Sequence, residues 1–173
     1  MKTLRLLLGD QLNSEHSWFD EVNPNVMYVM AEIRQETDYV KHHIQKIVGF
    51  FSAMQEFAAE LQSQQHQVVY IHLNDTTNLQ SFEKNIKSLI EKEQFTHFEY
   101  QFPDEYRLDE QLKNLRQSLS ITSSVCDSEH FMSSRNELGD FFEGKKTFLM
   151  ESFYHMMRKK HHILMEGDKP LTG

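Results

Sequence analysis

Cysteine is almost absent from this chain of 173 residues, in which Cys126 is the only one. A disulfide framework, a cysteine-ligated zinc site and an iron–sulfur cluster each need several thiols, so none of them can be built within the chain. Disulfide-rich chains belong to oxidising compartments, whereas a lone cysteine is typical of a reducing one. We therefore expect a cytoplasmic protein.

Long apolar segments are missing as well. The N-terminus, Met1-Lys2-Thr3-Leu4, leads into an apolar run that is too short for a signal peptide with its cleavage site. No run approaches the roughly 20 residues of a membrane-spanning helix. These absences predict a soluble chain with no membrane partner.

Glycine and proline are scarce, with six and three residues, whereas aromatic residues make up 12% of the chain. This composition is typical of a folded globular protein and excludes a disordered tail. The sequence contains no repeat and no linker, so residues 1–173 are expected to form a single domain. The net charge of −8 disfavours a DNA partner, because an acidic surface repels the phosphate backbone.

The motifs of several enzyme classes are also absent. The sequence has no Gly-x-x-x-x-Gly-Lys-Ser phosphate loop, no Gly-x-Gly-x-x-Gly after a strand, no Gly-x-Ser-x-Gly turn and no His-Glu-x-x-His. The pairs His42-His43 and His161-His162 cannot chelate a metal ion alone, because adjacent residues on a helix point about 100° apart. We therefore predict no metal site.

Short apolar runs alternate with segments of helical periodicity. The expected strands are residues 3–8, Val26–Ala31, Val68–Leu73, Phe95–Phe102 and about Leu119–Val125. The expected helices are about Asp38–Gln62, Leu79–Lys92, Asp104–Ser118 and Phe148–Met165. Strands that alternate with helices form crossover units, so we predict an α/β fold, a Rossmann-like three-layer domain with a mostly parallel five-stranded sheet.

Polar residues follow the first two expected strands. The first strand runs into the turn Gly9-Asp10-Gln11-Leu12, and Glu32 follows the second. The next helix carries Tyr39, His42 and Lys46 at steps of three and four, which puts them on one stripe. Because neighbouring parallel strands end at the same edge of a sheet, these side chains, with Glu36, can converge on one cleft. Two plainer interpretations stay open at this point, a polar turn at a strand end and a helix face exposed to water.

Ordered motifs along the whole chain resemble those of one family. They include Leu7-Leu8-Gly9-Asp10-Gln11-Leu12, Tyr39-Val40-x-His42-His43, Phe51-Ser52-Ala53-Met54, Glu105-Tyr106-Arg107, Phe131-Met132-Ser133-Ser134 and Met150-Glu151-x-Phe153-Tyr154. In this order and spacing they resemble the N-terminal region of photolyase-related proteins. The subgroup is that of the iron–sulfur bacterial cryptochromes and (6-4) photolyases.

The resemblance implies a Rossmann-like domain that holds an antenna chromophore, 6,7-dimethyl-8-ribityllumazine or a similar molecule. It also implies a larger helical domain with FAD, the iron–sulfur cluster and the DNA site, and that domain is absent from this chain. No catalytic residue can therefore be carried over, and DNA binding by this chain is not expected. The expected chromophore-binding residues are Gly9, Asp10, Gln11, Glu32, Glu36, Tyr39, His42, Lys46 and Glu105.

Three functions remain as hypotheses. The first is the antenna-binding domain of a photolyase- or cryptochrome-related flavoprotein, in DNA repair or light sensing, which is not itself a catalyst. The alternative is a stand-alone module that binds a nucleotide-like ligand or a protein. The third is a small enzyme that uses Asp10, Glu32 and His42 for acid–base chemistry. Besides the chromophore, the expected partner is the C-terminal photolyase domain or a second copy of the chain, contacted through the apolar stretch Phe141–Leu164.

Overall fold

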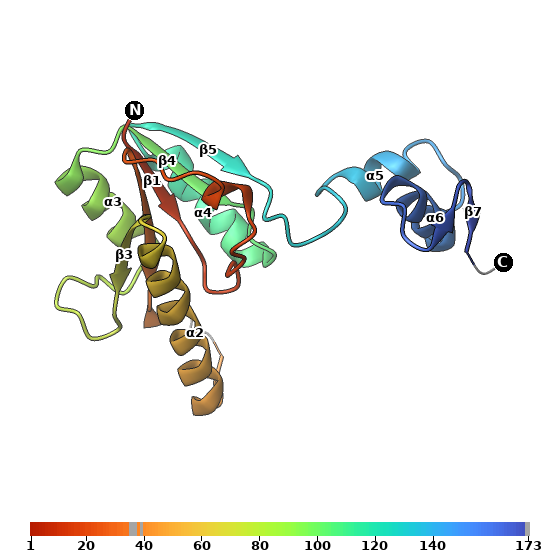
Figure 1. The fold of residues 1–173 in the computed structure, drawn as a ribbon. Helices are drawn as coiled ribbons and strands as arrows, with labels where there is room; N and C mark the ends of the chain where they lie inside the picture. The colour runs from red at the N-terminus through yellow and green to blue at the C-terminus, as the bar shows by residue number, and fades with distance from the viewer. Residues whose placement is uncertain (35–37, 39, 172–173) are drawn as a thin grey trace. The chain divides into compact units, whose positions relative to one another are not determined.

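A computed structural model describes residues 1–34, 38 and 40–171 (Figure 1). The chain divides into two compact units, a first unit of Met1–Ser128 and a second unit of Glu129–Gly173. Composition indicates no boundary there, because no segment rich in proline or glycine separates the two units.

The first unit is built around a parallel sheet of five strands (Figure 1). The strands are β1 (Thr3–Leu6), β2 (Val26–Ala31), β3 (Gln67–Ile71), β4 (His97–Gln101) and β5 (Thr122–Cys126). Their order is β3-β2-β1-β4-β5, and every neighbouring pair is parallel. This arrangement confirms the predicted Rossmann-like α/β fold. The strand order reverses between β1 and β4, which is where open α/β sheets bind ligands beyond the carboxyl ends of their strands.

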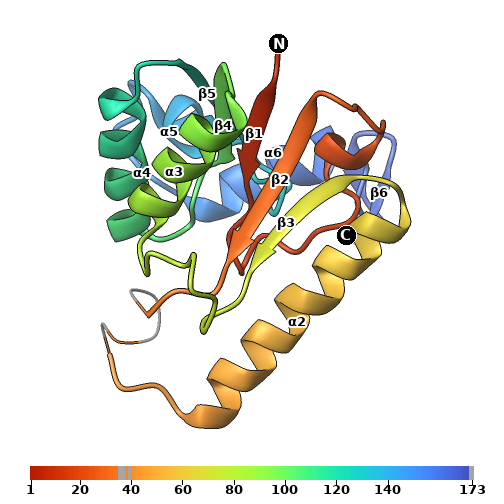
Figure 2. The same ribbon diagram turned by 90° about the vertical axis from the view of Figure 1, so that its left-hand side faces the viewer.

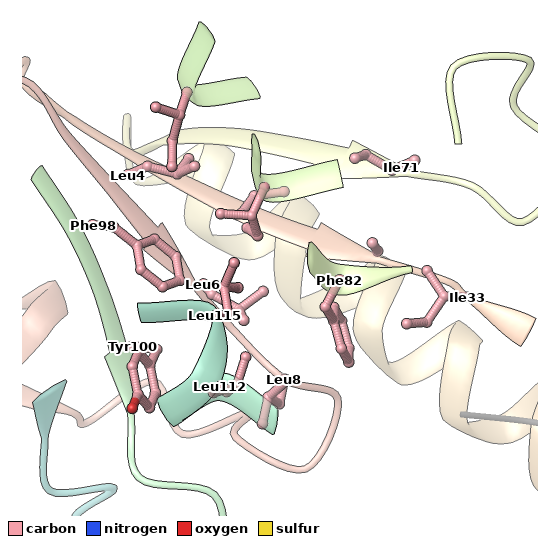
Figure 3. Close-up of a cluster of buried hydrophobic side chains, with 14 of the residues drawn as sticks. Leu4, Leu6, Leu8, Ile33, Ile71, Phe82, Phe98, Tyr100, Leu112 and Leu115 are labelled. Carbon is pink, nitrogen blue, oxygen red and sulfur yellow. The ribbon is translucent and has the colours of Figure 1, made fainter. Parts of the chain in front are cut away.

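Helices cover both faces of the sheet (Figure 2). On one face, Leu4, Leu6 and Leu8 pack with buried side chains of α3 (Phe82–Glu93) and α4 (Tyr106–Ser118), as Figure 3 shows. On the other face, Leu7 packs with α2 (Ile44–Ser63) and the short 3-10 helix η1 (Ser17–Phe19). Successive side chains of a strand point to opposite faces of the sheet. The apolar run that begins in β1 therefore contributes side chains to the core on each face.

Helix α2 begins later than the sequence indicates. It starts at Ile44 rather than near Asp38, because His43 has an extended backbone and its Nδ1 accepts a hydrogen bond from the Gln45 N–H at 3.2 Å. An extended residue with a side-chain acceptor caps a helix start. His42 precedes the helix, so the prediction that His42 and Lys46 share a helical stripe is wrong. Glu36 and Tyr39 lie outside the described residues.

The second unit contains α5 (Glu137–Phe142), α6 (Met150–Lys160) and a hairpin of β6 (Met165–Glu166) and β7 (Lys169–Pro170). Helix α6 ends five residues before the predicted end, with Arg158, Lys159 and Lys160 in its last turn. Cations there suit the negative end of the helix dipole. The hairpin and α5 were not predicted. Among residues 1–34, 38 and 40–171, no helix combines the length and the apolar character needed to cross a membrane.

Candidate functional site

A pocket of about 260 Å³ opens at the carboxyl edge of the sheet in the first unit. Its walls come from the ends of β1 and β2, the N-terminal half of α2 and the starts of α3 and α4. The described lining residues are Leu8, Gly9, Asp10, Ala31, Ile33, His42, Lys46, Ile47, Phe50, Phe51, Met54, Phe82, Glu105 and Leu108. The pocket thus lies at the edge of the sheet where this fold binds ligands.

Apolar side chains form most of the pocket wall. Leu8, Ile33 and Phe82 belong to the core on the α3–α4 face, where Figure 3 draws their side chains next to one another. Phe51 and Met54 come from α2, whose N-terminal half extends past the strand ends (Figure 2). Walls of this kind exclude water and favour the apolar body of a small molecule.

Four polar side chains stand in the same lining, namely Asp10, His42, Lys46 and Glu105. Lys46 Nζ lies 3.4 Å from His42 Nδ1. The Lys46 ammonium group can only donate hydrogen bonds, whereas the imidazole of His42 can donate or accept. The Glu105 carboxylate accepts two hydrogen bonds from Arg107, at 2.9 and 3.1 Å. The pocket therefore offers both donors and acceptors to one ligand.

Gly9 occupies the turn after β1 and lies directly under the α2 wall. A Cβ atom at this position would be 2.3 Å from Phe50 Cε1 and 2.8 Å from Met54 Sδ. Real Cβ atoms do not approach other atoms so closely, so a side chain at this position would displace the helix residues. Glycine at this position therefore leaves room for the ends of the Phe50 and Met54 side chains.

Gln11 is buried and its side chain bonds to backbone groups of the first unit. The Leu8 N–H donates to Oε1 at 3.1 Å, and Nε2 donates to the carbonyls of Gln101 and Phe102 at 3.3 and 3.4 Å. These bonds tie the turn after β1 to the end of β4. The described lining of the pocket does not include Gln11.

Glu32 is buried in a second network of internal bonds, at the ends of β2 and β3. Its Oε1 accepts hydrogen bonds from Gln55 Nε2 and the Tyr70 hydroxyl, both at 2.7 Å. Its Oε2 accepts a hydrogen bond of 2.8 Å from the Leu73 N–H. Burial, together with the bond to this carboxylate, raises the pKa of Tyr70 above its usual value. The described lining does not include Glu32 either.

Comparison with known proteins assigns the chain to a family. The family model described as deoxyribodipyrimidine photo-lyase-related protein matches residues 5–173. The chain belongs to this family.

Two relatives show how the chain compares in length. It is 33% identical, over its whole length, to a (6-4) photolyase of Agrobacterium fabrum, of which it spans the N-terminal 34%. It is 24% identical, again over its whole length, to an uncharacterized protein of Acanthamoeba polyphaga mimivirus, of which it spans 90%. The chain thus covers about a third of the photolyase and most of the viral protein.

The structure brings together Gly9, Asp10, His42, Lys46 and Glu105 of the residues expected from the photolyase resemblance. Sequence reasoning missed the apolar wall of α2, because its spacing is the same as that of a helix face buried in a core. One signal was present, since the periodic face of α2 is longer than a sheet of four- to six-residue strands can cover. Within the part of the chain that the structure describes, no three His, Cys, Asp or Glu side chains are grouped to hold a metal ion.

Proposed function

We propose that the first unit binds an antenna chromophore of the ribityllumazine class for a photolyase- or cryptochrome-related flavoprotein. The observation that carries the proposal is the pocket itself. Residues expected from the family resemblance, Asp10, His42, Lys46 and Glu105, meet apolar walls at the edge where the fold binds ligands.

The residues in the pocket fit the chemistry of such a ligand. Leu8, Ile33 and the α2 wall surround a flat ring and keep water from it. Asp10 and Glu105 accept hydrogen bonds from ring N–H groups or hydroxyls, while Lys46 and His42 donate to ring carbonyls.

The pocket volume sets where each part of the ligand lies. About 260 Å³ is just below the ~300–1,000 Å³ usual for ligand pockets, so we expect the bicyclic ring inside and the ribityl chain at the polar mouth. The bound chromophore absorbs blue or near-ultraviolet light and passes the excitation to a flavin, and this chain supplies its binding and orientation. With one cysteine, the chain holds no iron–sulfur cluster of its own.

A second function is supported by the viral relative, of which the chain spans 90%. A protein of this length can serve as a stand-alone module that binds a nucleotide-like metabolite in the same pocket. Such a module would bind adenosine or a nucleotide in preference to ribityllumazine. The two functions therefore use the same pocket and differ in the ligand that it binds.

The test is a fluorescence titration of 6,7-dimethyl-8-ribityllumazine into the wild-type chain, Asp10→Asn and His42→Ala. Asp20→Asn and His155→Ala serve as matched controls, because both residues are exposed and outside the pocket lining. We expect binding by the wild type and by both controls, and an affinity at least about tenfold lower in each pocket variant, since each loses a polar contact to the ring. Equal affinity in all five proteins would refute the pocket assignment, and binding of adenosine alone would favour the second function.

A further inference from the structure

Phe50 occupies an unusual position among the aromatic residues of the pocket. Phe82 is buried in the core on the α3–α4 face, and Phe51 packs against the core on the other face. Phe50 keeps 42% of its surface exposed although it stands in the pocket lining. Its ring is thus the aromatic surface of the lining that is most open to a ligand.

The turn after β1 fixes where the Phe50 ring can lie. Cε1 and Cζ of the ring would be 2.3 and 3.0 Å from a Cβ atom on Gly9. The ring therefore rests directly on the backbone of the turn, in the space that a side chain at residue 9 would fill. Contact with fixed backbone on one side holds a ring that is otherwise exposed.

We propose that Phe50 is the stacking wall of the pocket and that Gly9 provides its seat. The inference rests on the proposed function and names what the site selects, which is a planar heteroaromatic ring. An aliphatic wall would bind any apolar group of the right size. An exposed aromatic face adds a preference for flat π systems, because stacked rings attract one another beyond the area they bury.

The two residues are expected to act as a pair. Gly9 does not have a left-handed backbone conformation, so alanine at this position is strained by contact alone and not by its backbone angles. The added methyl group would push the Phe50 ring into the pocket. In Gly9→Ala combined with Phe50→Ala the contact with the ring is gone and only the flexible end of Met54, at 2.8 Å, must shift, so Phe50→Ala should cost less affinity there than it costs alone.

The experiment compares ring binding by the wild-type chain with binding by Phe50→Leu, Phe50→Tyr, Phe50→Ala, Gly9→Ala and the double variant. The probes are 6,7-dimethyl-8-ribityllumazine and riboflavin, followed by fluorescence. Phe131→Leu is the matched control, because Phe131 is 65% exposed and belongs to the second unit. Thermal unfolding checks that each variant is folded, and Phe50→Met replaces Phe50→Leu if the latter is not.

We expect Phe50→Leu to lower the affinity for both probes about tenfold and to lose the change in ligand emission that stacking produces. Phe50→Tyr should stay close to the wild type, and so should Phe131→Leu. If the wild type binds and Phe50→Leu binds equally well, the stacking wall is refuted while the proposed function stands. If neither probe binds to the wild type, the proposed function and the stacking wall are both refuted.

Discussion

The hydroxyl of Tyr70 on β3 donates a hydrogen bond of 2.7 Å to the Glu32 carboxylate, which follows β2. Gln55 of α2 and the Leu73 N–H donate to the same carboxylate. Three parts of the first unit are therefore joined by one buried side chain at the rim of the sheet. We therefore expect Glu32 to contribute to folding stability more than to ligand binding.

Glu32→Ala should lower the free energy of unfolding by about 2–4 kcal/mol, because it leaves three donors without their buried acceptor. Tyr70→Phe should cost only about 1 kcal/mol, since it removes a single donor. Urea unfolding followed by circular dichroism measures both. Glu83→Ala is the control, because Glu83 forms an exposed ion pair with Lys87 that is worth less than about 1 kcal/mol. A Glu32 variant as stable as this control would contradict the assigned role.

Gln11 and Asp10 are adjacent, yet we expect them to affect different measurements. Gln11→Ala should destabilise the first unit by about 1–3 kcal/mol, because the buried Leu8 N–H loses its acceptor. Asp10→Asn should reduce ligand affinity, because Asp10 lines the pocket. Gln117→Ala, at an exposed position of α4, is the control for stability. The prediction for Gln11 is contradicted if Gln11→Ala has the same free energy of unfolding as the wild type and only its ligand affinity falls.

The Glu99 carboxyl group predicts how stability responds to acid. Burial opposes its ionisation, but hydrogen bonds from Arg5 and Ser124 and the charge of Arg5 outweigh burial and hold the pKa of Glu99 below its ordinary value of 4.5. A carboxyl group whose pKa is lower in the folded state than in the unfolded state stabilises the fold at any pH above its unfolded-state pKa. That stability is lost as the pH falls through the folded-state pKa.

The measurement is the difference in unfolding free energy between the wild type and Glu99→Gln from pH 7 to pH 3. We expect a constant difference down to about pH 5 and a steady decrease below it. Glu110→Gln, a half-exposed glutamate of α4 paired with Lys113, should show no such trend. A difference that grew on acidification would reverse the sign and contradict the prediction.

Exposed apolar residues of the second unit lead us to expect that the chain associates with itself. None of the eleven described residues of α6 is buried, and Phe148, Leu149, Met150 and Tyr154 are each more than half exposed. Apolar groups gathered in this way usually mark a contact surface. Sedimentation across a concentration series should show a dimer, and Leu149→Glu with Tyr154→Glu should shift it to monomer. A wild-type chain that stays monomeric at the highest concentration would contradict self-association.

The sequence predicts the fold better than it predicts the site. Apolar runs define β2 to the residue, because a strand that is buried on both faces must be continuously apolar. The start of α2 was misplaced by about six residues, since periodicity continues through His43 and only the local hydrogen bond to Gln45 shows that the helix begins there. Capping by histidine has no strong sequence signature.

The polar residues at the strand ends illustrate a second limit. Asp10 and Gln11 are neighbouring polar residues in the turn after β1, and the sequence does not distinguish their roles. Asp10 lines the pocket, whereas the Gln11 side chain donates hydrogen bonds to the carbonyls of Gln101 and Phe102. Glu32 follows a strand as a ligand-binding residue would, yet its acceptors are engaged within the protein. Which polar group is satisfied internally depends on contacts between residues far apart in the chain, and a local pattern does not encode them.

The two halves of helix α2 differ in burial. Its buried residues, Met54, Phe57, Ala58 and Leu61, all lie in the second half, whereas the residues that line the pocket begin at Lys46. Backbone amides of the first turns should therefore exchange with deuterium much faster than those near Leu61, because little packing opposes local opening there. A ligand that fills the pocket would slow this exchange, and part of its binding energy would be spent on ordering the helix.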